Sequence, residues 1–104
     1  MAQFDVFVNP IQNARRGYPF VVAMQSEFTI DAAEQLVAPI ASIDYGQSAS
    51  RRVTPVIALR GNEHVVVVPR LTVMRTRDLI EKVSSIATAR TELLAAIDYL
   101  FFGV

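Results

Sequence analysis

The 104-residue sequence lacks cysteine and tryptophan, and it contains only one histidine and four glycines. Without cysteine it can form no disulfide framework, no zinc–thiolate site and no thiol nucleophile. The glycines are isolated, so no glycine-rich loop is present to hold a phosphate. One histidine and scattered carboxylates do not make a metal-ligand pattern. We therefore expect no cofactor, no metal ion and no cofactor-dependent catalysis.

The sequence also lacks an excess of either charge, because ten basic residues balance ten acidic ones. Nucleic-acid-binding proteins take most of their non-specific affinity from positive charge. We therefore expect no direct binding of DNA or RNA, and any effect on nucleic acid should pass through a protein partner.

Long apolar runs are missing as well. Runs such as Val65–Val68 and Leu93–Ile97 are far shorter than the roughly 18 residues that a membrane span requires. The first residues have neither the basic nor the apolar segment of a secretory signal. We expect one domain over residues 1–104, located in the cytoplasm and not in a membrane.

Most of the sequence before residue 75 has the alternation and the β-branched content of strands. Strands are expected at Phe4–Val8, Tyr18–Met24, Gln35–Ile40, Val53–Leu59 and Val65–Val68, with a further short strand at Leu71–Met74. Pro39 suits an edge strand or a bulge. Gly61-Asn62 predicts a two-residue hairpin turn. The continuous apolar run Val65–Val68 predicts a strand that is buried on both faces.

From Ile86 onward the apolar residues recur at spacings of three and four, which predicts a helix from about Ile86 to about Phe101. Its apolar stripe, Phe101 included, should cover the sheet, and Gly103 should end it. Capping side chains are available at Ser84, Ser85 or Thr88. Strands followed by one helix predict an α+β fold, an antiparallel, partly closed β-barrel with a C-terminal helix.

The segment Ala96–Val104 carries the most functional information. Phe102 lies about 100° around the helix from Phe101, so it need not face the core. An exposed aromatic ring at the end of a helix can anchor a partner, because a few aromatic side chains often dominate the energy of an interface. We therefore expect binding to another protein through this end.

The sequence resembles the CcdB family, the toxins of plasmid and chromosomal toxin–antitoxin modules. Five segments in the family's order carry the resemblance: Gln3–Phe7, Phe20–Glu27, Val37–Ile40, Thr54–Ile57 and Ala96–Val104. The resemblance implies an SH3-like barrel that forms a homodimer. It also implies that the two helix ends dock on the A subunit of DNA gyrase and trap its cleaved-DNA complex, a topoisomerase poison that makes and breaks no bond itself.

The resemblance also implies roles for single residues. Positions matching the gyrase-binding residues of the family are Phe102, Gly103, Val104, Asp98, Phe28, Thr29 and Phe4. A largely disordered, acidic CcdA-like antitoxin is implied as a second partner. Arginines that could receive it are Arg15, Arg16, Arg51, Arg52, Arg70, Arg75 and Arg77, and the sequence does not choose among them.

Two other functions remain open. An endoribonuclease toxin on the same barrel would need an acid–base pair and a cation near the scissile phosphate. Candidates for these roles are His64, Glu63, Asp44, Arg51 and Arg52, although we expect His64 to be a surface residue. The other alternative is a non-toxic dimeric relative that no longer binds gyrase, because Phe102 and Val104 replace Trp and Ile of the best-known members.

Overall fold

The computed structural model describes residues 1–29, 33–44 and 50–104. In these residues the chain forms seven strands, five short 3-10 helices and one α-helix, α1 (Arg90–Phe102). The strands are β1 (Asp5–Val8), β2 (Phe20–Ala23), β3 (Glu34–Ser42), β4 (Val56–Leu59), β5 (Asn62–Val66), β6 (Thr72–Arg75) and β7 (Lys82–Ser85). The 3-10 helices are η1 (Gln12–Ala14), η2 (Glu27–Thr29), η3 (Val68–Arg70), η4 (Thr76–Asp78) and η5 (Ala87–Ala89).

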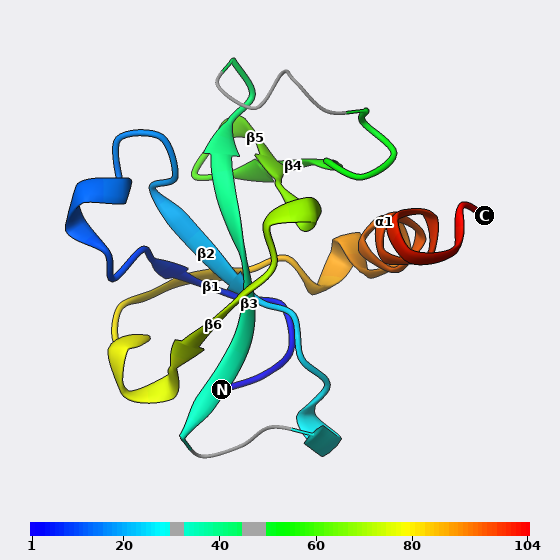
Figure 1. Cartoon of the computed structure of the whole chain (residues 1–104). Coiled ribbons are helices and arrows are strands. Elements are labelled where there is room, and N and C mark those ends of the chain that lie inside the picture. The colour runs from blue at the N-terminus through cyan, green and yellow to red at the C-terminus, as the bar shows by residue number, and fades with distance from the viewer. Residues whose placement is uncertain (30–32, 45–49) are drawn as a thin grey trace.

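The strands form one antiparallel sheet in the order β4-β5-β3-β2-β1-β7, and β6 pairs with β3. The sheet curls into part of a barrel, and α1 projects from one side of it (Figure 1). This arrangement confirms the predicted α+β class and the partly closed, SH3-like barrel with a C-terminal helix. None of the helices in the described ranges is long and apolar enough to cross a membrane.

β3 is the central strand of the sheet, so an edge position for Pro39 is wrong. β2 pairs along one side of β3, while β5 and β6 share the other side and are separated by η3. Pro39 lies opposite this interruption, where its carbonyl accepts a hydrogen bond of 2.9 Å from the Val67 N–H. A residue without an N–H group fits in the middle of the sheet because the neighbouring strand is broken there.

The β4–β5 hairpin turns one residue earlier than predicted. Leu59 pairs with Asn62, so the two turn residues are Arg60 and Gly61, with φ values of 53° and 79°. Positive φ at both positions is characteristic of a type I′ turn. The register is decided by burial of Leu59, because a slip of one residue would move every side chain of β4 to the opposite face.

β7, which lies just before the helical segment, was not predicted. Its sequence contains little apolar surface, but it pairs with β1 and brings Lys82 Nζ to 3.3 Å from the buried Asp5 carboxylate. The helical segment begins with η5 directly after β7, and α1 follows it from Arg90. Ser85, one of the three predicted capping residues, accepts a 3.3 Å hydrogen bond from the Ala87 N–H at this start. The N-cap of α1 itself is Ala89, which makes no side-chain hydrogen bond.

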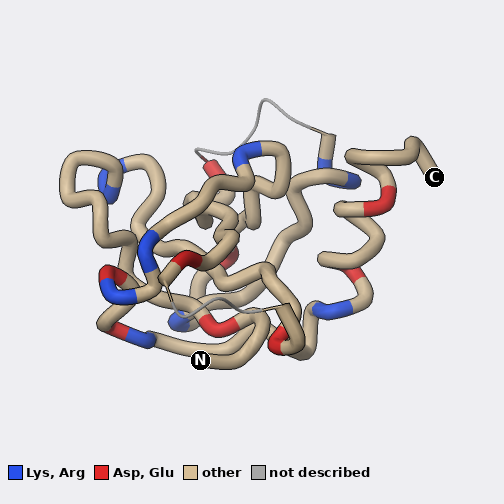
Figure 2. The backbone as a smooth tube through the Cα atoms, turned by 60° about the horizontal axis from the view of Figure 1, so that its bottom comes forward, with Lys and Arg blue, Asp and Glu red and all other residues tan. Residues whose placement is uncertain are grey.

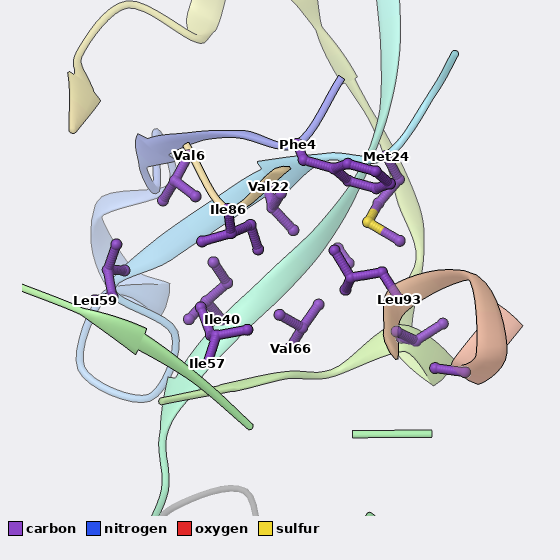
Figure 3. Close-up of a cluster of buried hydrophobic side chains, with 13 residues drawn as sticks. Phe4, Val6, Val22, Met24, Ile40, Ile57, Leu59, Val66, Ile86 and Leu93 are labelled. Atoms are coloured by element: carbon purple, nitrogen blue, oxygen red, sulfur yellow. The ribbon is translucent and has the colours of Figure 1, made fainter. Parts of the chain in front are cut away.

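The main core lies between the concave face of the sheet and α1 (Figure 3). Phe4, Ile40, Val66 and Leu93 meet there, together with side chains of β2, β4 and η5. A second cluster, which includes Val21 and Leu79, covers the other face of β1–β3. All of Val65–Val68 is buried, as predicted, although the strand itself ends at Val66.

Candidate functional site

The first half of α1 holds the helix on the barrel. Leu93 and Ala96 are the buried residues of this helix, and Ile97 packs partly against the same core. The helix packs on η3, and Leu93 and Ala96 place its first half in the core beside the sheet. Its second half therefore extends beyond the barrel, toward the C-terminal end marked in Figure 1.

The last residues of the chain, Leu100–Val104, form an exposed apolar surface that we call the helix tip. Phe101, Phe102 and Val104 are 62%, 75% and 78% exposed. The two phenyl rings lie with their centroids 6.5 Å apart. Burial of Phe101 in the core was expected and is wrong, because the barrel ends before the helix reaches that position. The tip is thus larger than the sequence indicated.

Gly103 ends the helix in the predicted way. Its φ is 72°, and its N–H donates a 3.0 Å hydrogen bond to the carbonyl of Tyr99. Glycine adopts this left-handed conformation without a steric penalty. The cap ends the helix, and Val104 follows it as an exposed residue.

One exposed carboxylate, that of Asp98, lies just before the helix tip. Asp98 is exposed one residue before the last turn, and that turn contains no basic residue. A carboxylate close to the C-terminal end of a helix is disfavoured by the helix dipole. Asp98 therefore does not stabilise α1 through the dipole, and it is available to a cation on a partner.

Phe28 and Thr29 lie on a different part of the surface. They belong to η2, which Figure 1 places well away from the end of α1. The Phe28 ring is completely exposed, and the backbone N–H of Phe28 donates to Ser26 Oγ over 3.2 Å. Gln25 fixes this loop, since its side chain donates to the Thr29 carbonyl and accepts from the Leu36 N–H. The structure does not bring Phe28 and Thr29 together with the helix tip.

Phe4 is not on the surface at all. Its side chain is 1% exposed and belongs to the main core. We expected Phe4 to contact the partner directly, but in this structure it can only support other residues from within the core. The Arg90 guanidinium lies 6.0 Å from the centre of the Phe4 ring, and Arg90 Nη1 donates to Gln3 Oε1 over 3.0 Å. Phe4 therefore supports the first turn of α1 from the side of the core.

His64 is buried, contrary to the surface position that we expected. It is 8% exposed, its ring meets Phe20 edge-on at 5.8 Å, and its Nδ1 lies 3.1 Å from the carbonyl of Asn62. A ring held in this way is poorly placed to exchange protons with an RNA substrate. Of the other candidates for an endoribonuclease site, Asp44 and Glu63 are exposed, and Arg51 donates to Thr54.

One contact near the tip was missed in the sequence. The Arg52 guanidinium carbon lies 3.7 Å from the centre of the Tyr99 ring. The two residues are far apart in the chain and belong to no shared motif, so only the fold brings them together.

Acidic and basic positions are intermixed over the chain in Figure 2, so neither sign forms one large patch. Throughout 1–29, 33–44 and 50–104, no group of three or more His, Cys, Asp or Glu side chains is placed to hold a metal ion. The surface feature that stands out is therefore apolar. Another exposed apolar side chain, Ile80 at 82%, lies in a groove beside Val73 and Ile11, away from α1.

The family of the chain is shown by comparison with protein-family models. The family model described as CcdB protein matches residues 3–103. The matched range contains every strand described above and all of α1, and it ends at the capping glycine. No curated protein matches the chain.

Proposed function

The chain belongs to the CcdB family, and from this membership we propose that it binds the A subunit of DNA gyrase and traps the complex of gyrase with cleaved DNA. Membership supports the broader description, a toxin of a toxin–antitoxin module. The gyrase target and the residues that bind it are our proposal, as is action in the cytoplasm, where gyrase works. In this proposal the toxin acts by binding its target and carries out no chemistry of its own.

The exposed helix tip is the observation that carries this proposal. Phe102 and Val104 have little of their own chain to pack against, and burying them on a partner would remove apolar surface from water. The face of a phenyl ring attracts a cation, and Asp98 lies one turn before Phe102. Gyrase surface with an arginine beside an apolar pocket would complement both features. Gly103 contributes the left-handed cap between Phe102 and Val104.

A binding protein can poison an enzyme only by preferring one of its states. A ligand with equal affinity for all states of gyrase would shift none of them, however tightly it bound. We propose that the tip binds the cleaved-DNA state more tightly than the other states. In a homodimer two tips would act at one site, which increases this preference. The partly disordered antitoxin would reverse it by covering the toxin, and the exposed arginines remain its candidate contacts.

The test is a gyrase cleavage assay. Purified protein is mixed with gyrase, ATP and relaxed plasmid, and the linear DNA trapped after denaturation is quantified. We expect the full chain to raise the amount of linear DNA. Phe102→Ala and a chain ending at Phe101 should require at least about 30-fold more protein, as expected when an anchor residue of an interface is lost.

The matched control is Ile80→Ala, which removes an equally exposed apolar side chain away from the tip. It should act like the native chain. If the native chain fails to raise linear DNA, gyrase poisoning is rejected and the non-toxic dimer is favoured. If Ile80→Ala is as defective as Phe102→Ala, the tip is not the binding site.

Phe28 needs a separate test because it lies apart from the tip. A fully exposed phenylalanine in a hydrogen-bonded loop is a second candidate contact with gyrase. If it acts in this way, Phe28→Ala reduces cleavage while the tip is intact. Unchanged cleavage would remove Phe28 and Thr29 from the proposed site.

A further inference from the structure

The stacking of Arg52 on Tyr99 lies close to the helix tip. The guanidinium carbon is 3.7 Å from the ring centre, which is van der Waals contact between the cation and the ring face. Arg52 precedes β4, and Tyr99 belongs to the last part of α1. The contact thus joins the body of the barrel to the part of the helix that extends beyond it.

The segment that carries Arg52 is itself well held. The N–H groups of Val53 and Thr54 donate to the Ser50 carbonyl over 3.0 and 3.1 Å, and the Arg52 N–H donates to Ser50 Oγ over 3.2 Å. Thr54 is buried, and its hydroxyl also donates to the Ser50 carbonyl. Arg52 therefore projects from a fixed turn and not from a free loop.

Tyr99 is equally well placed to transmit this contact to the tip. It follows Ala96, the last buried residue of α1, and its carbonyl accepts the hydrogen bond from the capping Gly103. The opposite end of the helix has a comparable contact, since Arg90 lies over the Phe4 ring and donates to Gln3. An arginine therefore supports α1 at each end, outside the short buried stretch.

We propose that Arg52 is a positioning residue that sets the direction of the helix tip by stacking on Tyr99. A tip that is already held loses less conformational freedom on binding, so its affinity is higher than that of a mobile tip. The effect on gyrase rests on the function proposed above, whereas the effect on the helix does not. Exposed cation–π contacts of this kind correspond to about a two- to fivefold change in an equilibrium constant.

The first experiment measures the helix in the free protein. Backbone ¹⁵N relaxation and amide exchange of residues 100–103 are compared in native protein, Arg52→Ala, Tyr99→Leu and the double variant. We expect about two- to fivefold faster exchange and greater mobility in Arg52→Ala, and no additional change in the double variant. Tyr99→Phe keeps the ring and should behave like the native protein. Unchanged mobility in Arg52→Ala would overturn the proposal.

The second experiment measures the half-maximal concentration for gyrase-dependent DNA cleavage. Arg52→Ala should require about two- to fivefold more protein, and Tyr99→Phe should act like the native chain. Arg52→Lys keeps the charge without the planar guanidinium, so it should recover only part of the activity. The control is Arg77→Ala. It removes the same charge from an exposed position in η4, an element separate from α1.

The two experiments separate the possible failures. If the native chain does not act on gyrase, the proposed function fails, while the mobility of residues 100–103 still decides the role of Arg52. If Arg77→Ala weakens cleavage as much as Arg52→Ala, the effect is one of overall charge and positioning is rejected. If mobility rises in Arg52→Ala but cleavage is unchanged, positioning does not contribute to binding and the proposal is overturned at that step.

Discussion

Two apolar segments of this chain have opposite surroundings. Val65–Val68 is buried throughout, whereas the helix tip, Leu100–Val104, is exposed throughout. Both segments contain large apolar side chains, and both were expected to contribute to the core at least in part. The comparison shows that apolar composition does not by itself say which residues are covered.

The difference comes from how each backbone distributes its side chains. In the valine segment alternate residues enter different clusters: Val66 and Val68 join the main core, and Val65 and Val67 pack with Ala41 on the other face. A helix instead places successive side chains about 100° apart, and the barrel covers only one side of α1 as far as Ala96. Exposure of the tip is thus a consequence of where the barrel ends.

The largest contrast is expected when the same charge is placed in both segments. Val66→Asp puts a carboxylate without a partner into the main core and should cost at least about 4 kcal/mol, a large part of the stability of a domain of this size. Val104→Asp puts it at an exposed position and should change the free energy of unfolding by less than about 0.5 kcal/mol. Urea denaturation followed by circular dichroism measures both. Equal losses would mean that the tip is buried in solution.

A second pair of variants locates the end of the covered part of α1. Leu93→Ala removes a fully buried side chain and should destabilise the fold by about 2–5 kcal/mol. Leu100→Ala, seven residues along the same helix, should cost less than about 1 kcal/mol because its side chain is partly exposed. Thermal denaturation of the two proteins tests this difference. A loss at Leu100 as large as that at Leu93 would indicate that the tip is packed, for example against a second copy.

The smallest contrast concerns the two glycines with positive φ. Gly61→Ala forces an alanine into the left-handed conformation inside the β4–β5 hairpin and should cost about 1 kcal/mol of global stability. Gly103→Ala imposes the same strain, but a free helix end can fray to relieve it. We therefore expect a change below about 0.5 kcal/mol in unfolding and a clear loss of amide protection near residue 103. Equal global losses would show that the end of α1 is as firmly held as the hairpin.

Several elements were recognisable in the sequence because their signals are local. β1, β2 and β6 follow from runs of β-branched and aromatic residues, and Gly103 follows from its place after the helical spacing ends. β7 was missed because its four residues carry little apolar surface and are held by pairing with β1. A strand that depends on its neighbour leaves no periodic pattern of its own.

The candidate site was recognised in part, and for different reasons at different residues. Phe102, Gly103, Val104 and Asp98 lie together on one exposed end, because consecutive residues of a helix end remain close in any fold. Phe4 was assigned to a binding surface by resemblance, yet the curl of the sheet places it in the core. The partner of Tyr99 could not be found in the sequence, since Arg52 reaches it only through tertiary structure.

By itself the sequence determined the class of the fold, the family and the helix end that carries the apolar residues, since hydrophobic periodicity, turn residues and the order of segments are encoded along the chain. The tertiary structure decided which of these residues are covered. Burial of His64 and Phe4, exposure of Phe101 and the central place of Pro39 depend on which strands pair and where the barrel ends. Those are contacts between residues distant in sequence, and local patterns do not specify them.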